Sequence, residues 1–145
     1  MNKKRHHYLG TVPLASVCVA MLLSLCGTNS MFAHALLIKS IPGDKSKWSQ
    51  PPIHVDLWFD ELLDEGFNSI EVIPAAELAN KTHLNMAKGQ PKVDPADRTH
   101  LSVELSALAP GKYVIQYRVL SRDGHTAPGR LTFQVLETKP KSQAE

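Results

Sequence analysis

Apolar and polar residues alternate along much of this chain, which is the period of a β-strand with one buried face. The alternation is cleanest over residues 53–59 and strongest over residues 112–120. Weaker runs of the same kind predict further strands over residues 34–41, 69–73, 100–105 and 130–136. Turn signals rich in proline, glycine and aspartate separate these runs. The pattern therefore predicts an all-β domain.

The spacing of the strands indicates their arrangement. Short strands at this spacing, without long helices between them, are typical of a Greek-key β-sandwich or barrel. The longest irregular segment, residues 75–97, contains Pro91 and Pro95 and is expected to carry one short helical turn near residues 75–80. Tyr113 follows a Pro-Gly turn at the start of a strand, which is typical of a tyrosine corner, although an ordinary core tyrosine explains it too.

Residues 1–33 have the order of a secretory signal peptide. Lys3, Lys4 and Arg5 form a positively charged start, and residues 9–25 are uncharged and mainly apolar. This apolar stretch is shorter than the roughly 20 residues that a membrane-spanning helix needs, so cleavage is favoured over an uncleaved anchor. The sequence therefore predicts that the mature chain is exported.

The position of the cleavage site determines the first residue of the mature chain. Cleavage at the end of the predicted leader makes His34 that residue, although it puts Met31 where a small residue is preferred. An A-x-A match centred on His34 offers a second cleavage site, which would remove His34 and begin the chain at Leu36. Lipidation at Cys26 is a third alternative.

Removing the leader changes the charge and redox character of the chain. The 145-residue sequence without residues 1–33 keeps 112 residues, which suits one domain, and it keeps neither of the two cysteines. The leader holds three of the sixteen Lys and Arg and none of the fourteen Asp and Glu, which leaves a net charge of −1. This balance gives no argument for nucleic-acid binding. We expect a folded domain over residues 34–138 and a disordered tail over residues 139–145.

Three residues carry chemistry that suits one metal site. An N-terminal His34 offers a free amine and an imidazole as one chelate, while Asp123 and His125 add a carboxylate and a second imidazole in a turn. Three nitrogens and one oxygen suit a tetragonal Cu(II) ion. Taken alone, Asp123-Gly124-His125 favours a plain hairpin turn, and His34 alone is explained by a frayed terminus. The hypothesis of a copper site therefore requires the fold to bring the two segments together.

Other residues give weaker signals. Asp60 and Glu61 follow a strand and are interpreted as solvated charges, with a further metal-ligand role as the alternative. Met86 is the one methionine after the leader, too few for a Cu(I) site built from thioethers. No G-x-S-x-G, Cys-x-x-Cys or His-x-Glu pattern is present in the mature chain, so no catalytic residue is predicted. The remaining histidines without spaced partners are interpreted as surface polar residues: His54, His83 and His100.

Three motifs in the mature chain resemble those of the CopC family of periplasmic copper-binding proteins. The motifs are His34-Ala35-x-Leu37-x-x-Ser40-x-Pro42, Leu57-x-Phe59-x-Glu61, and Leu108-x-Pro110-Gly111-x-Tyr113 followed by Ser121-x-Asp123-Gly124-His125. They occur in the family's order and cover nearly all of the mature chain. The resemblance implies an immunoglobulin-like or cupredoxin-like β-sandwich that binds one Cu(II) per chain. It implies His34, Asp123 and His125 as ligands, with Glu61 a ligand only in some members.

The resemblance implies a non-catalytic periplasmic carrier or buffer of Cu(II) in copper homeostasis or resistance, with an inner-membrane CopD-type copper transporter as partner. A copper-dependent oxidase or monooxygenase is an alternative, because such enzymes also pair an N-terminal histidine with a second histidine. A metal-free exported interaction module is another, and it gains support if cleavage falls before Leu36. Protonation of the amine, with a pKa of about 7.7–8.0, and of the imidazoles, with a pKa of about 6.5, predicts weaker copper binding in acid.

Overall fold

The computed structural model describes residues 35–137 of the chain. The predicted signal peptide (residues 1–33), His34 and the predicted tail (residues 139–145) lie outside the described residues. The described part forms eight β-strands and one short 3₁₀ helix, which confirms the all-β prediction. No helix within it is long and apolar enough to cross a membrane.

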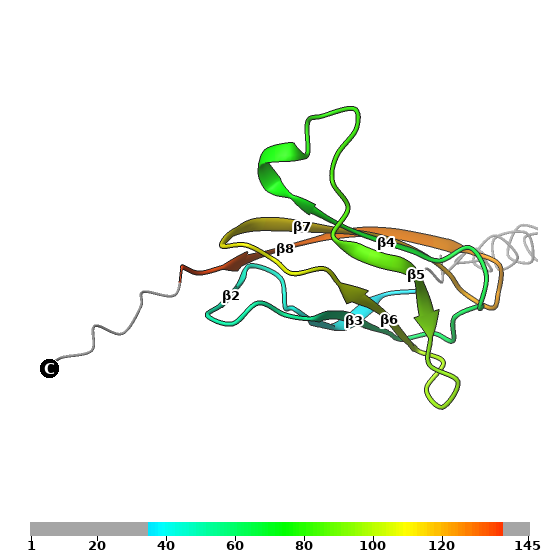
Figure 1. Cartoon of the computed structure of the whole chain (residues 1–145). Coiled ribbons are helices and arrows are strands. Elements are labelled where there is room, and N and C mark those ends of the chain that lie inside the picture. Colours follow the sequence, from blue (N-terminus) through cyan, green and yellow to red (C-terminus); the bar gives the residue numbers. More distant parts are fainter. Residues whose placement is uncertain (1–34, 138–145) are drawn as a thin grey trace, which may run out of the picture. The chain divides into compact units, whose positions relative to one another are not determined.

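The strands form two four-stranded sheets that face each other as a sandwich (Figure 1). The first sheet contains, in spatial order, β1 (Leu37–Ile41), β3 (His54–Phe59), β6 (His100–Leu105) and β5 (Ala87–Val93). The second contains, in spatial order, β2 (Ser46–Trp48), β8 (Thr126–Val135), β7 (Gly111–Leu120) and β4 (Ser69–Pro74). Neighbouring strands are antiparallel except β2 and β8, which are parallel. The Greek-key β-sandwich prediction is therefore confirmed.

The core lies between the two sheets and follows the alternation of the sequence. Val55, Leu57 and Phe59 of β3 are fully buried, whereas the residues between them are partly exposed. Across the core, Ile115 and Val119 of β7 are also fully buried. Each such side chain contributes about 1.5–3 kcal/mol relative to an exposed one, so the period of two along each strand positions the two sheets against each other.

Two strands were not predicted, and several strand boundaries differ from the prediction, among them the start of β1 at Leu37 and the start of β8. Residues 87–93 form β5, although they lie in the segment predicted to be irregular, and residues 46–48 form the short β2. β5 contains Gly89 and Pro91, and its pairing with β6 shifts register between Lys88 and Lys92. Proline and glycine are tolerated there because β5 is an edge strand with no neighbour on its outer side. β8 begins at residue 126, four residues before the predicted start, because its first residues continue the ladder with β7.

Two local predictions are confirmed. The short helical turn expected near residues 75–80 is the 3₁₀ helix η1 (Ala75–Glu77), in a segment that projects from the sandwich (Figure 1). The hydroxyl of Tyr113 donates a hydrogen bond of 2.8 Å to the carbonyl oxygen of Ala109, which is the tyrosine corner. The Tyr113 ring also stacks on Phe133 of β8. The corner thus anchors the connection into β7, the strand that leads to the candidate metal site.

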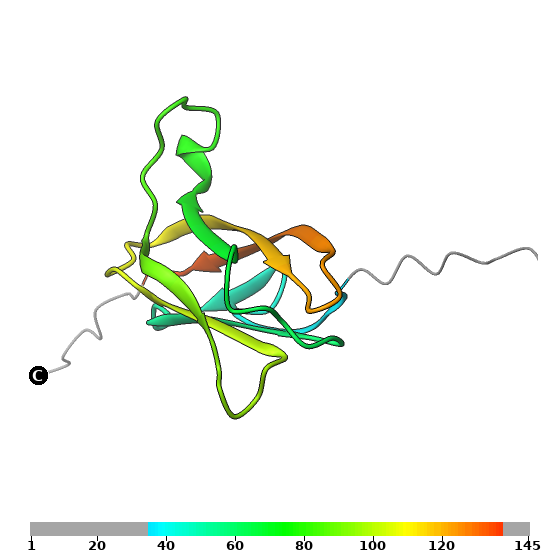
Figure 2. The same ribbon diagram turned by 90° about the vertical axis from the view of Figure 1, so that its right-hand side faces the viewer.

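The start of the described chain and the β7–β8 turn lie at the same end of the sandwich (Figure 2). Residues 35–37 and residues 126–128 line a common pocket of about 250 Å³, with Tyr117 as a further lining residue. The β3–β4 loop, residues 60–68, reaches this end as well and forms hydrogen bonds to both segments. Segments far apart in the sequence therefore meet around the predicted ligands.

Candidate metal centre

The β7–β8 turn is built on a buried serine. Ser121 is 1% exposed, and its backbone N–H and carbonyl oxygen bond His125 and Gly124 at 2.9 Å each. Its hydroxyl donates a short hydrogen bond to Oδ1 of Asp123, which also accepts the backbone N–H of His125 at 3.1 Å. Gly124 takes a positive φ of 89°, a conformation that glycine adopts without strain. The predicted Asp-Gly turn is therefore confirmed, with the Asp123 carboxylate held from both sides.

The two predicted ligands of this turn contact each other. Oδ2 of Asp123 lies 2.9 Å from Nδ1 of the His125 ring, and the His125 side chain is 59% exposed. A histidine held by a carboxylate at one ring nitrogen typically binds a metal through the other, so this contact orients the ring for binding through Nε2. The pair thus supplies an oriented imidazole and an adjacent carboxylate at the surface.

Hydrogen bonding keeps the carboxylate of Asp123 ionised. The pKa of Asp123 is lowered to about 2, above all by the hydrogen bond from the Ser121 hydroxyl, and then by those from the backbone and ring of His125. Each of these bonds stabilises the charged form. An ionised oxygen is therefore present for a cation at any pH near neutrality.

His34, the third predicted ligand, lies outside the described residues. Ala35, which follows it, is buried against the core, and the next residue, Leu36, is held by the β3–β4 loop. Leu36 donates its N–H to Oδ1 of Asp60 at 2.6 Å, and its carbonyl oxygen accepts the Asp60 N–H at 3.0 Å. The segment that follows His34 is therefore anchored beside the β7–β8 turn.

The role of Asp60 differs from the solvated charge that the sequence suggested. Its carboxylate accepts the backbone N–H of Leu36. Glu61, the neighbouring candidate, forms no contact with Asp123 or His125 among the described side chains. Within residues 35–137, no three His, Cys, Asp or Glu side chains are grouped so as to hold a metal ion. Among the described residues, the structure therefore brings together two of the predicted ligands, Asp123 and His125.

The β3–β4 loop is hydrogen-bonded to the peptide groups on both sides of Ser121, the first residue of the β7–β8 turn. Arg122 donates its N–H to the carbonyl oxygen of Leu62 at 3.0 Å, and Asp64 donates its N–H to the carbonyl oxygen of Leu120 at 2.8 Å. Leu63, between them, is fully buried and forms a β-bridge with Ser121. The loop and the turn therefore form one rigid unit.

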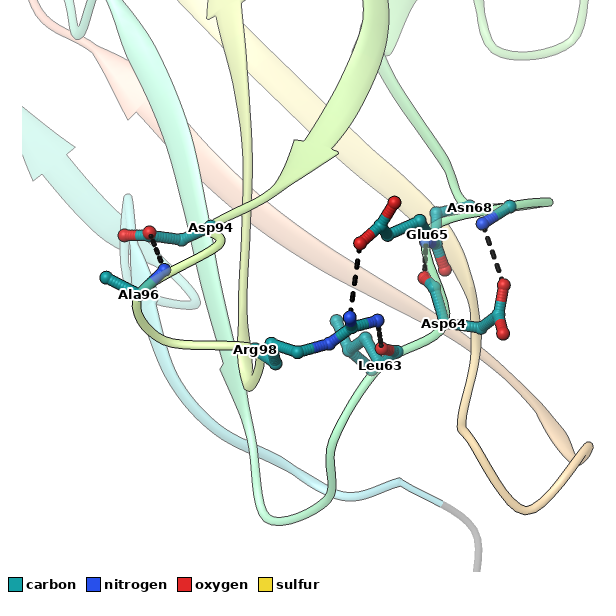
Figure 3. A network of polar contacts seen from close by, with 8 residues as sticks. Leu63, Asp64, Glu65, Asn68, Asp94, Ala96 and Arg98 are labelled. Carbon is teal, nitrogen blue, oxygen red and sulfur yellow. Dashed lines mark hydrogen bonds and ion pairs between the residues drawn. The ribbon is translucent and has the colours of Figure 1, made fainter.

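Arg98, from the β5–β6 connection, ties this loop to the first sheet (Figure 3). Its Nη2 donates to the carbonyl oxygen of Leu63 at 2.8 Å, and its Nη1 lies 3.1 Å from Oε1 of Glu65. In return, the Leu63 N–H donates to the Arg98 carbonyl oxygen at 2.8 Å. The sequence did not predict the contact between Arg98 and Leu63, because these residues are 35 positions apart and neither belongs to a motif.

His100 was wrongly interpreted as a surface residue without partners. Its side chain is 17% exposed, and its Nε2 lies 2.8 Å from Oδ1 of Asp56 while its Nδ1 lies 3.6 Å from Oδ2 of Asp94. The ring stacks on Trp58 with a centroid distance of 4.4 Å. His83 also has a carboxylate partner, Glu71, at 3.6 Å. His100 is therefore part of a polar cluster on the first sheet, whereas His83 lies in the connection between η1 and β5 and pairs with a residue of β4.

Comparison with known proteins shows the family to which this chain belongs. The family model described as the CopC domain matches residues 37–136, and the chain belongs to the CopC family. Protein YobA of Escherichia coli K12 is 30% identical over 118 residues, which cover 81% of this chain and 90% of YobA. Copper transport protein CutJ of Bacillus subtilis is 30% identical over 74% of this chain, which corresponds to 19% of CutJ. The crystal structure of CopC from Methylosinus trichosporium OB3b is 28% identical with a TM-score of 0.61, covering 74% of this chain and 98% of that one.

Proposed function

We propose that this protein is a copper carrier or buffer of the periplasm that binds one Cu(II) per chain in copper homeostasis or resistance. The ligands are the amine and imidazole of His34, the carboxylate of Asp123 and the imidazole of His125. The observation that supports this most directly is the Asp123–His125 pair, held at 2.9 Å on a rigid turn beside the anchored start of the described chain. Membership of the CopC family and the copper transport function named for CutJ agree with it.

The chemistry of the ligand set favours Cu(II). Divalent copper heads the affinity order for a given nitrogen and oxygen site, and three nitrogens with one oxygen match its tetragonal preference. A carboxylate that stays ionised, as that of Asp123 does, adds charge neutralisation without a proton to displace. The amine and imidazoles must lose protons to bind, so acid releases the ion.

The proposed maturation and use of the protein follow from the predicted segments. Residues 1–33 act as a signal peptide that is cleaved before His34, residues 34–138 form the copper-binding domain, and residues 139–145 form a tail. The carrier then passes copper to or from an inner-membrane transporter of the CopD type. We propose no catalytic activity for the chain.

Intact-mass measurement of the exported protein, with and without added Cu(II), tests this proposal. A mature mass beginning at His34 and a gain of one copper per chain are expected. Affinity is then measured by competition with a chelator for the variants His34→Ala, Asp123→Ala and His125→Ala, with His54→Ala as a matched exposed control. Each ligand variant should bind weakly, whereas the control should bind normally.

Three results would contradict the proposal. A mature chain that begins at Leu36 removes the amine chelate and leaves a metal-free exported module as the better explanation. A native N-terminus that binds no Cu(II) leads to the same conclusion. Sustained oxygen consumption with copper and a reductant identifies an oxidase or monooxygenase instead of a carrier.

A further inference from the structure

One short segment contacts both halves of the proposed copper centre. At its first residue, Asp60 forms two hydrogen bonds with Leu36, one through the backbone N–H and one through the carboxylate. At its end, residues 62–64 bond to both sides of Ser121, the buried base of the β7–β8 turn. The segment 60–64 therefore connects the N-terminal ligand segment to the turn that carries the other two ligands.

The segment is itself held against the first sheet. Leu63 is fully buried, and its peptide groups on both sides are bonded to Arg98 (Figure 3). Phe59 and Leu63 are buried in the core on either side of Asp60, so the backbone that carries the exposed Asp60 side chain is held at both ends. A carboxylate on a restrained backbone can hold the N–H group that it accepts in one place, whereas a carboxylate on a mobile loop would move together with that group.

We propose that Asp60 is a positioning residue of the proposed copper centre, because its carboxylate fixes the backbone of Leu36, two residues after His34, at the end of the sandwich that carries Asp123 and His125 (Figure 2). This inference rests on the proposed function. A chain terminus normally frays, and a frayed terminus must lose conformational entropy before its amine and imidazole can bind a metal. With Leu36 anchored and Ala35 buried, only one residue separates the anchor from the chelating residue.

Substitution of Asp60 by asparagine separates this role from that of a ligand. Oδ1 of Asp60 accepts the Leu36 N–H at 2.6 Å, the length of a strong charge-assisted hydrogen bond. A positioning residue needs an acceptor at this place, and asparagine provides one without the charge. A ligand to Cu(II) needs an anionic oxygen, which asparagine does not provide.

Two substitutions of Asp60 and one matched control test the proposal. Asp60→Ala should weaken Cu(II) binding about 10–100-fold, the usual effect of losing a group that orients a metal ligand. Asp60→Asn should stay within about fivefold of the unsubstituted protein, because a neutral hydrogen bond is roughly half as strong as a charge-assisted one. The control is Asp44→Ala, since Asp44 accepts the N–H of Thr132 at 2.9 Å, and Thr132 lies on β8 well beyond the turn. It should leave Cu(II) affinity unchanged.

Two further measurements distinguish positioning from loss of the fold. Hydrogen exchange of the Leu36 amide should accelerate in Asp60→Ala and stay protected in Asp60→Asn, while amides of β7 stay protected in both. The electron paramagnetic resonance spectrum of bound Cu(II) should broaden or split in Asp60→Ala and keep the original parameters in Asp60→Asn. If Asp60→Ala does not fold, Asp60→Leu, which has a similar size and no acceptor, takes its place in every comparison.

Several outcomes would overturn the inference. Unchanged affinity and spectrum in Asp60→Ala would show that the Leu36 contact does not position the ligand. Equal losses in Asp60→Asn and Asp60→Ala, with Leu36 still protected in the asparagine variant, would make Asp60 a ligand. A separate form with one glycine added before His34 tests the amine chelate itself. If that form binds copper normally, the proposed function fails whatever Asp60 does.

Discussion

Oδ2 of Asp123 and Nδ1 of His125 lie 2.9 Å apart across a turn that is anchored by the buried Ser121. The contact joins a carboxylate with a strongly lowered pKa to an exposed imidazole, and it fixes the ring before any metal binds. Pre-orientation of this kind reduces the entropy that binding must overcome. The pair is therefore the part of the proposed copper centre whose geometry can be tested first.

Replacing Asp123 by asparagine removes the charge but keeps the size of the side chain. Cu(II) affinity should fall by at least about 10–100-fold, because the ion loses an anionic oxygen and the His125 ring loses its charged partner. Competition titration against a chelator measures this. Asp97→Asn is the control, since Asp97 also caps a turn but bonds Thr99 in the β5–β6 connection. Equal affinities of the Asp123 variant and the control would contradict the prediction.

Acid should destabilise the copper-free protein below about pH 5. Four carboxyl groups have a pKa below the ordinary value of 3.8, each through hydrogen bonds to its charged form: Asp44, Asp94, Asp97 and Asp123. A group with a lowered folded pKa stabilises the fold above its unfolded pKa, and this contribution is lost as the pH falls through the folded value, which is about 2 for Asp123. The midpoint of urea unfolding should therefore decrease from about pH 5 to about pH 2. A smaller decrease is expected for Asp123→Asn, and an identical decrease would contradict its contribution.

Gly129 is required by the packing of Tyr117 on the neighbouring strand. A Cβ atom at position 129 would lie 2.7 Å from Cε1 of Tyr117, and the ring is held on another side by an edge contact with Phe59. Gly129→Ala should lower the free energy of unfolding by about 1–3 kcal/mol, as overpacking does. Urea unfolding measures the change. Gly43→Ala, where the nearest atoms are 4.0 Å away, should cost much less, and equal losses would contradict the packing argument.

Leu63 should affect both stability and copper binding. It is fully buried and bridges to Ser121, so Leu63→Ala leaves a cavity beneath the turn. A loss of about 2–5 kcal/mol in the free energy of unfolding is expected, together with weaker Cu(II) binding. Leu105→Ala is the matched control, since Leu105 is buried at the end of β6 away from the turn. Leu105→Ala should lose similar stability and keep its affinity for Cu(II). If Leu105→Ala also loses affinity, general destabilisation of the fold explains the effect of Leu63→Ala.

His100 should matter for stability and leave copper binding unchanged. Its ring stacks on Trp58 and bonds Asp56, both on β3. His100→Ala should lower the free energy of unfolding by about 1–3 kcal/mol, because Asp56 loses a half-buried hydrogen-bond partner. Thermal unfolding and competition titration measure the two properties. A clear fall in Cu(II) affinity would connect this cluster to the copper centre and contradict its separate role.

The strands were largely predictable because each is encoded locally. The alternation over residues 53–59 and 112–120 reappears as β3 and β7, since a period of two buries one face of a strand wherever it lies. β5 was missed because its polar residues, with a glycine and a proline, carry no such period. Its strand conformation comes from pairing with β6 at the edge of the sheet.

The candidate site, like the strands, was predictable from the sequence only where its contacts are local. The sequence by itself determined the Asp-Gly turn, the ligand types of Asp123 and His125, and the tyrosine corner, because each depends on residues at most four apart. Only the tertiary structure decided that Asp60 anchors Leu36, 24 residues away, and that Asp56 bonds His100, 44 residues away. The physical reason is that a local pattern specifies which face of a strand is buried. The residue that it meets on a neighbouring strand depends on which strands pair, in which register they pair, and where each connection crosses the end of the sandwich.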